Sequence, residues 1–141
     1  MKSKAALVAR ILLGLVFFVF GLNGFLGFIP DPEMTSEAGA FMTALSDTGY
    51  MLVLIKLVET ACGALLLAGF FVPLALVLLA PILINILAFH LFLDPSPQGL
   101  GMAIVIVALH LFLTSQHWSA YTPILVAKTG MSEEAAGGEA A

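Results

Sequence analysis

Four long apolar segments constrain the fold of this chain more than any other feature of its sequence. Each holds the roughly 20 mostly apolar residues that an α-helix needs to cross a hydrocarbon core about 30 Å thick. The spans are expected at about residues 6–28, 50–70, 72–93 and 99–120. The sequence therefore predicts an all-α membrane protein, in which residues 1–127 form one bundle of four transmembrane helices.

The composition argues against a soluble domain. Hydrophobic residues make up 61% of the 141-residue chain and charged residues 10%, whereas soluble domains carry about 25% charged residues. A chain this short cannot bury so much apolar side chain in its own core, so the lipid bilayer is the expected solvent for the excess. The few basic residues form no cluster that could follow a nucleic-acid backbone, which excludes nucleic acid as a partner.

The connection between the first two spans is polar and acidic, yet its apolar residues recur at helical spacing. These residues are Met34, Ala38, Phe41, Met42 and Leu45. The spacing predicts a short amphipathic helix over residues 33–46, lying on the membrane surface at the outer mouth of the bundle. An ordered loop is the alternative.

Basic residues gather near the two ends of the chain. Lys2, Lys4, Arg10 and Lys128 lie on the side that holds both termini of a four-span protein, and the connections on the other side carry acidic residues but no lysine or arginine. By the positive-inside rule, both termini are expected in the cytoplasm. Residues 128–141 are small and acidic, and we expect them to form a disordered cytoplasmic tail.

The second span contains the most informative polar residues, Lys56 and Glu59. A lysine or a carboxylate at the centre of a span costs about 2.5–3.5 kcal/mol on insertion. The two residues share one helix face with Thr60 and Gly63, and their spacing of three allows an ion pair. Two interpretations stay open: a buried pair that fixes the orientation of the helix, or a ligand-binding or proton-handling site.

His110 lies near the middle of the fourth span, at a depth similar to that of Glu59. The two side chains could meet across the bundle, where a histidine beside a carboxylate would be a plausible proton carrier. The alternative is a neutral histidine bonded to a backbone carbonyl. His110 and His117 are seven residues apart, about 10 Å along a helix, so a metal site is not expected.

Three further polar residues in the spans are candidate ligand-binding residues. Asn85, in the third span, is expected to hydrogen-bond across helices. His90 is near the outer end of that span, either in the bundle or in the headgroup region. Asn23, flanked by Gly21 and Gly24, lies where a partner helix or a ligand can approach closely.

Several motifs together resemble the DoxX family of small four-helix membrane proteins, over about residues 6–125. They are residues 10–14, 20–25, 56–59 followed by Gly63, 71–75, Asn85 and 89–95. A glutamate in the second span followed by a glycine four residues later is the most characteristic part. Many members carry a lysine at the outer end of the first span, where this chain has Asn23, Gly24 and Phe25.

The resemblance implies several functions. The family is named after a small subunit of a thiosulfate:quinone oxidoreductase, other bacterial relatives are membrane partners of oxidative-stress enzymes, and distant eukaryotic relatives act in receptor assembly and cargo export. It thus indicates an accessory subunit of a redox or stress-response system in the bacterial cytoplasmic (inner) membrane. Such a subunit would bind a quinone-like or other apolar ligand within the bundle, and quinone is the one cofactor indicated.

Two other functions stay open. One is a non-catalytic assembly partner for another membrane protein, and the other is a small proton-coupled carrier. Either could act as a homo-oligomer or with another membrane subunit. The chain has no cofactor motif and a single cysteine, so we expect no independent enzyme, whereas an oxidoreductase subunit stays open.

Overall fold

The computed structural model describes residues 3–127 of the chain. Its four long helices are α1 (Lys4–Leu26), α3 (Met51–Ala68), α4 (Val72–Ala88) and α5 (Pro97–Gln116). A π-helix, η1 (Phe89–Leu93), continues α4, and the remaining helices are α2 (Ser36–Asp47), α6 (Trp118–Tyr121) and η2 (Thr122–Leu125). The four long helices, with η1 added to α4, are long and apolar enough to cross a membrane. Residues 3–127 contain no strand, and the predicted fold class is confirmed.

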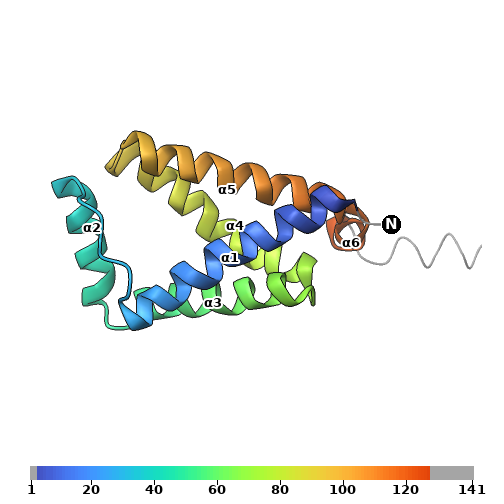
Figure 1. Ribbon diagram of the computed structural model, residues 1–141, viewed down its shortest axis with the longest axis horizontal. Coiled ribbons are helices and arrows are strands. Elements are labelled where there is room, and N and C mark those ends of the chain that lie inside the picture. Colours follow the sequence, from blue (N-terminus) through green and yellow to red (C-terminus); the bar gives the residue numbers. More distant parts are fainter. Residues whose placement is uncertain (1–2, 128–141) are drawn as a thin grey trace, which may run out of the picture.

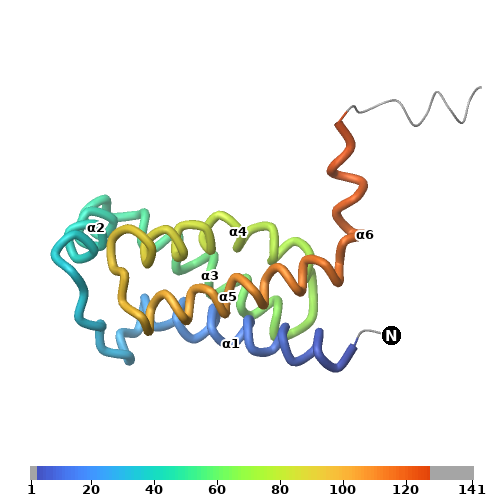
Figure 2. Tube along the Cα trace, turned by 90° about the horizontal axis from the view of Figure 1, so that it is seen from above, coloured from blue at the N-terminus to red at the C-terminus, as the bar shows by residue number. Residues whose placement is uncertain are grey.

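The four long helices form a bundle in which each packs against two neighbours: α1 and α4 each contact α3 and α5. In Figure 1, α2 lies across one end of the bundle, and α6 lies at the opposite end, where α1 begins. We call these the α2 end and the α6 end. Figure 2 shows α6 and η2 turning away from the bundle at the α6 end. The predicted tail at residues 128–141 lies outside the described residues.

Local capping sets the ends of the spans. The first begins at Lys4 because the Ser3 hydroxyl accepts a hydrogen bond from the Ala6 amide, and it ends at Leu26 because Gly27 adopts φ 60°. The fourth begins at Pro97, two residues before its predicted start, because Ser96 caps it. It ends at Gln116, where the chain bends into α6, rather than near residue 120.

Small residues let α1 and α3 pack closely. A Cβ atom on Gly21 would lie 2.6 Å from the Thr60 amide nitrogen, and one on Gly63 would lie 2.4 Å from the Phe18 amide nitrogen. Real Cβ atoms essentially never approach a heavy atom so closely, so only glycine fits at either position. Close backbone approach through glycine is a common way for membrane helices to associate.

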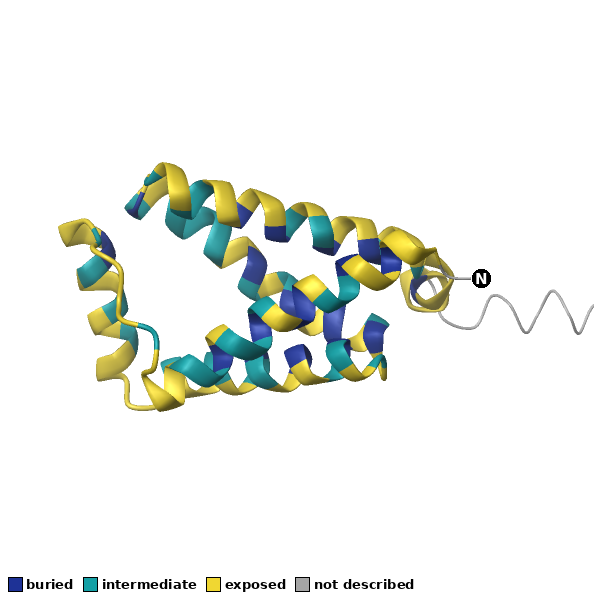
Figure 3. Cartoon of the chain, viewed as in Figure 1, coloured by how far each residue is buried: buried dark blue, intermediate teal, exposed yellow. Residues whose placement is uncertain are grey.

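Apolar side chains cover the outside of the bundle as well as its core. Buried residues face the neighbouring helices, whereas much of the outer surface of the long helices is exposed (Figure 3). Leu57, Leu74 and Leu111 are among many large apolar side chains that are more than half exposed. A soluble monomer rarely exposes so much contiguous apolar surface, so the four long helices form a membrane bundle.

The amphipathic helix predicted between the first two spans is confirmed as α2. It begins at Ser36, three residues later than expected, because the Thr35 side chain caps it by accepting a hydrogen bond from the Ala38 amide. The same hydroxyl donates to the Leu93 carbonyl at 2.5 Å, and the rings of Phe41 and Phe89 lie 5.9 Å apart. These contacts hold α2 against η1, over the end of the bundle.

Candidate functional site: a cavity beneath α2

A cavity of about 350 Å³ lies under α2, between α3 and α4. It is lined by Phe41, Met42 and Leu45 of α2, Met51, Leu52, Ile55, Lys56 and Glu59 of α3, Pro81, Ile82, Asn85 and Ile86 of α4, and Phe89 and His90 of η1. Along α3 it reaches from Met51 to Glu59, a depth of about 12 Å at the helical rise. Four of the six candidate residues named from the sequence, Lys56, Glu59, Asn85 and His90, therefore line one cavity.

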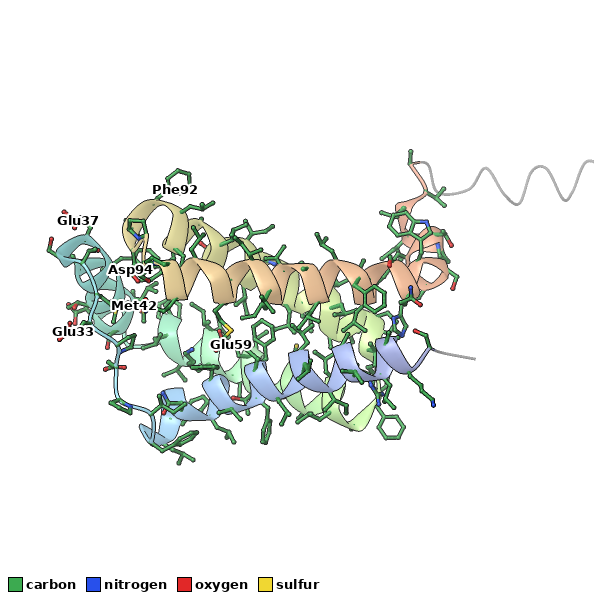
Figure 4. The ribbon with its side chains drawn as sticks, turned by 45° about the horizontal axis from the view of Figure 1, so that its top comes forward. Glu33, Glu37, Met42, Glu59, Phe92 and Asp94 are labelled. Carbon is green, nitrogen blue, oxygen red and sulfur yellow. The ribbon has the colours of Figure 1, made fainter. Side chains whose placement is uncertain are left out.

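Lys56 and Glu59 form an ion pair at the deep end of this cavity. The Lys56 Nζ lies 2.7 Å from the Glu59 Oε2, and the two side chains are 23% and 6% exposed. In Figure 4, Glu59 lies between the helices, whereas Glu33 and Glu37 lie on the far side of α2. The pair predicted from the spacing is thus present, and Glu59 is the more deeply buried partner.

The backbone of α1 determines where the Lys56 side chain can run. A Cβ atom on Gly24 would lie 2.4 Å from the Lys56 Cγ, so this glycine makes room for the aliphatic part of the lysine. The Thr60 hydroxyl donates to the Lys56 carbonyl at 2.7 Å, within α3. The close packing of α1 on α3 therefore positions the ammonium group beside Glu59.

Asn85 lies on the opposite wall, and the hydrogen bond predicted for it is wrong. Its Nδ2 donates to the Pro81 carbonyl at 3.3 Å, one turn back in the same helix, instead of to another helix. The reason is its position on α4: Leu79 and Leu83 occupy the buried face, while Asn85 and Pro81 are exposed. The cavity therefore extends from the bundle to the outward face of α4.

His90 lies at the cavity in η1, where it approaches a buried carboxylate. Its Nδ1 is 3.7 Å from the Asp94 Oδ2 and 3.4 Å from the Asp94 carbonyl oxygen. The Asp94 carboxylate accepts a hydrogen bond from the Ser96 hydroxyl at 3.2 Å, and Asp94 is 8% exposed. The Asp94 amide donates to the Phe89 carbonyl, five residues back, as in a π-helix.

Asp94 is not among the site residues predicted from the sequence, because an aspartate followed by Pro95, Ser96 and Pro97 is typical of a turn. The usable signal was its spacing of four residues from His90 at the end of a helix, which brings two side chains onto one face. π-helical turns inside longer helices are frequent at functional sites. His90 and Asp94 thus extend the polar part of the site toward the α2 end.

Comparison with known proteins agrees with this architecture. The family model of DoxX matches residues 5–91, which is more than half of the chain. The chain belongs to the DoxX family. No curated protein and no solved structure matches it.

The DoxX match covers every residue that lines the cavity. It ends at residue 91, short of the resemblance expected to about residue 125. The assignment of α5 as the fourth span is therefore supported by its own length and hydropathy and by its packing against α1 and α4.

The remaining two candidates of this DoxX protein lie outside the cavity and bond to the backbone. The His110 Nε2 donates to the Leu76 carbonyl at 2.8 Å, which ties α5 to α4. His110 is therefore bonded to a backbone carbonyl, which was the alternative to a contact with Glu59. Asn23 bonds to Ile29 in both directions: its Oδ1 accepts from the Ile29 amide at 2.6 Å, and its Nδ2 donates to the Ile29 carbonyl at 3.4 Å. It stabilises the turn that follows α1.

The chemistry of the cavity suits an apolar molecule with hydrogen-bond acceptors. Its walls are mostly aliphatic and aromatic, and their polar side chains supply an ammonium group, a carboxylate, an amide and an imidazole. No group of three or more histidine, cysteine or acidic side chains among residues 3–127 could hold a metal ion.

Proposed function

We propose that this DoxX protein binds a quinone-like ligand in the cavity beneath α2 and serves as an accessory subunit of a membrane redox or stress-response system. One observation carries the proposal: a buried Lys56–Glu59 ion pair lies at the deep end of an apolar cavity. Charged groups inside a membrane protein are costly, and they usually mark a functional site. The family resemblance supports the redox setting.

The head group of the ligand would lie between the two polar walls. Lys56 and Asn85, which both line the cavity, would hold the head group by donating hydrogen bonds. Glu59 would hold the Lys56 ammonium in position through the ion pair, in which Nζ lies 2.7 Å from Oε2. A bound quinone supplies two-electron, two-proton chemistry, whereas the protein supplies the binding site and orients the head group.

The ligand would enter from the bilayer. Pro81 and Asn85 line the cavity and are also exposed on the outward face of α4, while α2 covers the end of the bundle. A cavity of about 350 Å³ is at the small end of the range for ligand pockets, about 300–1,000 Å³. It would hold a head group and the first part of a tail, and a longer tail would leave between α3 and α4 into lipid.

The proposal places the protein in a bacterial cytoplasmic membrane with both termini in the cytoplasm. Lysine and arginine are concentrated near the two ends of the chain, and the connections on the opposite side are acidic. The α2 end, which holds the cavity, would then face the periplasm. A partner subunit would reach the ligand from that side or through the membrane.

The test compares two tryptophan substitutions on α3. Ile55→Trp fills the cavity, whereas Leu57→Trp adds the same side chain at a residue that is 56% exposed on the outer surface. Each protein is purified in mild detergent, titrated with a short-chain quinone, and extracted to identify bound small molecules. We expect Ile55→Trp to weaken quinone binding at least tenfold and Leu57→Trp to leave it unchanged. Equal binding by both variants, or a wild-type protein that neither binds the short-chain quinone nor retains a small molecule, would contradict the proposal.

A further inference from the structure

A second charged site lies in α1 at the α6 end. Arg10 is inside the first span, yet the part of the chain that the structure describes offers it no hydrogen bond and no ion pair. The acidic residues in that part are Asp31, Glu33, Glu37, Asp47, Glu59 and Asp94. They lie at the α2 end or halfway along α3, so none can serve as the counter-ion of Arg10.

Arg10 borders a small cavity of about 120 Å³, together with Ala6, Leu7 and His117. The His117 Nδ1 donates to the Leu113 carbonyl at 2.9 Å, which orients the imidazole ring at the end of α5. The cavity therefore combines a guanidinium and an imidazole with apolar side chains of α1. A planar guanidinium is well suited to a phosphate group, which it can bind through two parallel hydrogen bonds.

The packing around Gly69 holds the guanidinium in place. Gly69 follows α3 with φ 77°, and a Cβ atom there would overlap the Arg10 Nη1. A cation at the carboxyl end of a helix is favoured by the helix dipole. This contact orients Arg10 but leaves its hydrogen-bond donors without acceptors among residues 3–127.

The surroundings indicate the depth of the site. Arg10 lies six residues after Lys4, about 9 Å along the helix. Trp118, next to His117, is 56% exposed, and tryptophan is enriched where membrane helices meet the headgroups. Leu7, on the edge of the cavity, is 51% exposed on the lipid-facing side. The cavity therefore lies where a phospholipid phosphate meets its acyl chains.

We propose that this cavity binds the phosphate of an anionic phospholipid, with Arg10 as the ligand. The phosphate supplies a counter-charge that residues 3–127 do not offer to Arg10, and the acyl chains lie against Leu7 and its neighbours on α1. Basic pockets between transmembrane helices are known to bind anionic lipid headgroups. The site is at the opposite end of the bundle from the cavity beneath α2, and it does not depend on the quinone proposal.

The test is native mass spectrometry of the full chain with an equimolar mixture of phosphatidylglycerol and phosphatidylcholine. We expect the wild type to retain the anionic lipid about tenfold better, and Arg10→Gln to reduce that preference to about twofold or less. Lys4→Gln, which removes an exposed charge from the same helix, is the matched control and should keep the preference. If Arg10→Gln does not fold, Leu7→Trp, which fills the edge of the same cavity, takes its place and should lower the preference at least threefold.

Two results would overturn the lipid site. One is the same lipid preference in the wild type and in the folded cavity variants. The other is displacement of the bound lipid by inorganic phosphate at millimolar concentration, which would assign the site to free phosphate. The lipid site is supported if the wild type and Lys4→Gln retain the anionic lipid in phosphate buffer and Arg10→Gln does not.

Discussion

Replacing Glu59 with glutamine keeps the shape of the side chain but leaves the Lys56 ammonium without its counter-ion. Breaking a fully buried ion pair in this way costs about 3–5 kcal/mol. The Lys56 side chain is 23% exposed, whereas Glu59 is 6% exposed, so the lysine keeps partial access to a polar surrounding. We therefore expect Glu59→Gln to destabilise the protein by about 2–3 kcal/mol, which corresponds to a decrease in melting temperature of about 5–10 °C.

The chain contains its own reporter for this measurement. Its single cysteine, Cys62, is 1% exposed, so a fluorogenic maleimide reacts only when the bundle opens. Glu33→Gln, in the exposed connection before α2, makes the same chemical change outside the bundle and should leave the melting temperature nearly unchanged. A decrease for Glu33→Gln as large as that for Glu59→Gln would refute the argument from burial.

The double substitution Glu59→Gln with Lys56→Met separates the two interpretations of the pair. It removes both charges, so it should restore the melting temperature to within a few degrees of wild type, because an apolar replacement of a buried pair is often neutral. If the pair is part of the binding site, the double variant folds but binds quinone poorly. A stable double variant with wild-type binding would leave only a structural role for Lys56 and Glu59.

Three more predictions test the packing, the topology and α2. Gly63→Ala places a Cβ 2.4 Å from the backbone of α1 and should destabilise the protein by about 1–3 kcal/mol. Gly101→Ala is the control: nothing lies within 4 Å of its new Cβ, so its melting temperature should equal or exceed that of the wild type. Equal melting temperatures for the two variants would contradict the close contact between α1 and α3. Reporter fusions at Ser96 and Ala141 should report opposite compartments, and the same compartment for both would exclude the four-span topology. Hydrogen bonds from its own backbone and from the side chain of its serine neighbour lower the pKa of Glu37. The ionised carboxylate therefore stabilises the first turn of α2 fully above about pH 4.5. This stabilisation is lost as the pH falls through the lowered pKa. A nitroxide on α2 should therefore become more mobile in acid in the wild type than in Glu37→Gln, and identical pH profiles would contradict this role.

The features set by local chemistry were accessible from the sequence. Hydropathy located the four spans, because lipid requires about 20 apolar residues for each crossing. Helical spacing identified α2, and the spacing of three residues identified the Lys56–Glu59 pair. The observed ends of the spans differ from the predicted ends by a few residues. Caps such as Ser3 and Gly27 set these ends through single hydrogen bonds, which hydropathy does not detect.

The features set by tertiary contacts were not accessible. The partner of Asn23 is Ile29, which comes within reach only because the chain turns back after Gly27. His110 bonds to the Leu76 carbonyl on another helix. The similar depth of His110 and Glu59 in their spans does not show whether their side chains face each other. The cavity itself depends on how α2 lies across the bundle, which follows from long-range contacts such as that between Thr35 and Leu93.

The central claim is that the cavity beneath α2 binds the ligand, and photo-cross-linking tests it most directly. The full chain in lipid nanodiscs is irradiated with a short-chain quinone carrying an azide on its ring, and the labelled peptides are mapped by mass spectrometry. The account predicts labelling within residues 41–59 and 81–90, reduced by excess unlabelled quinone and by Ile55→Trp but not by Leu57→Trp. Labelling spread over the lipid-facing surfaces of α1 and α5, with no competition by unlabelled quinone, would contradict it.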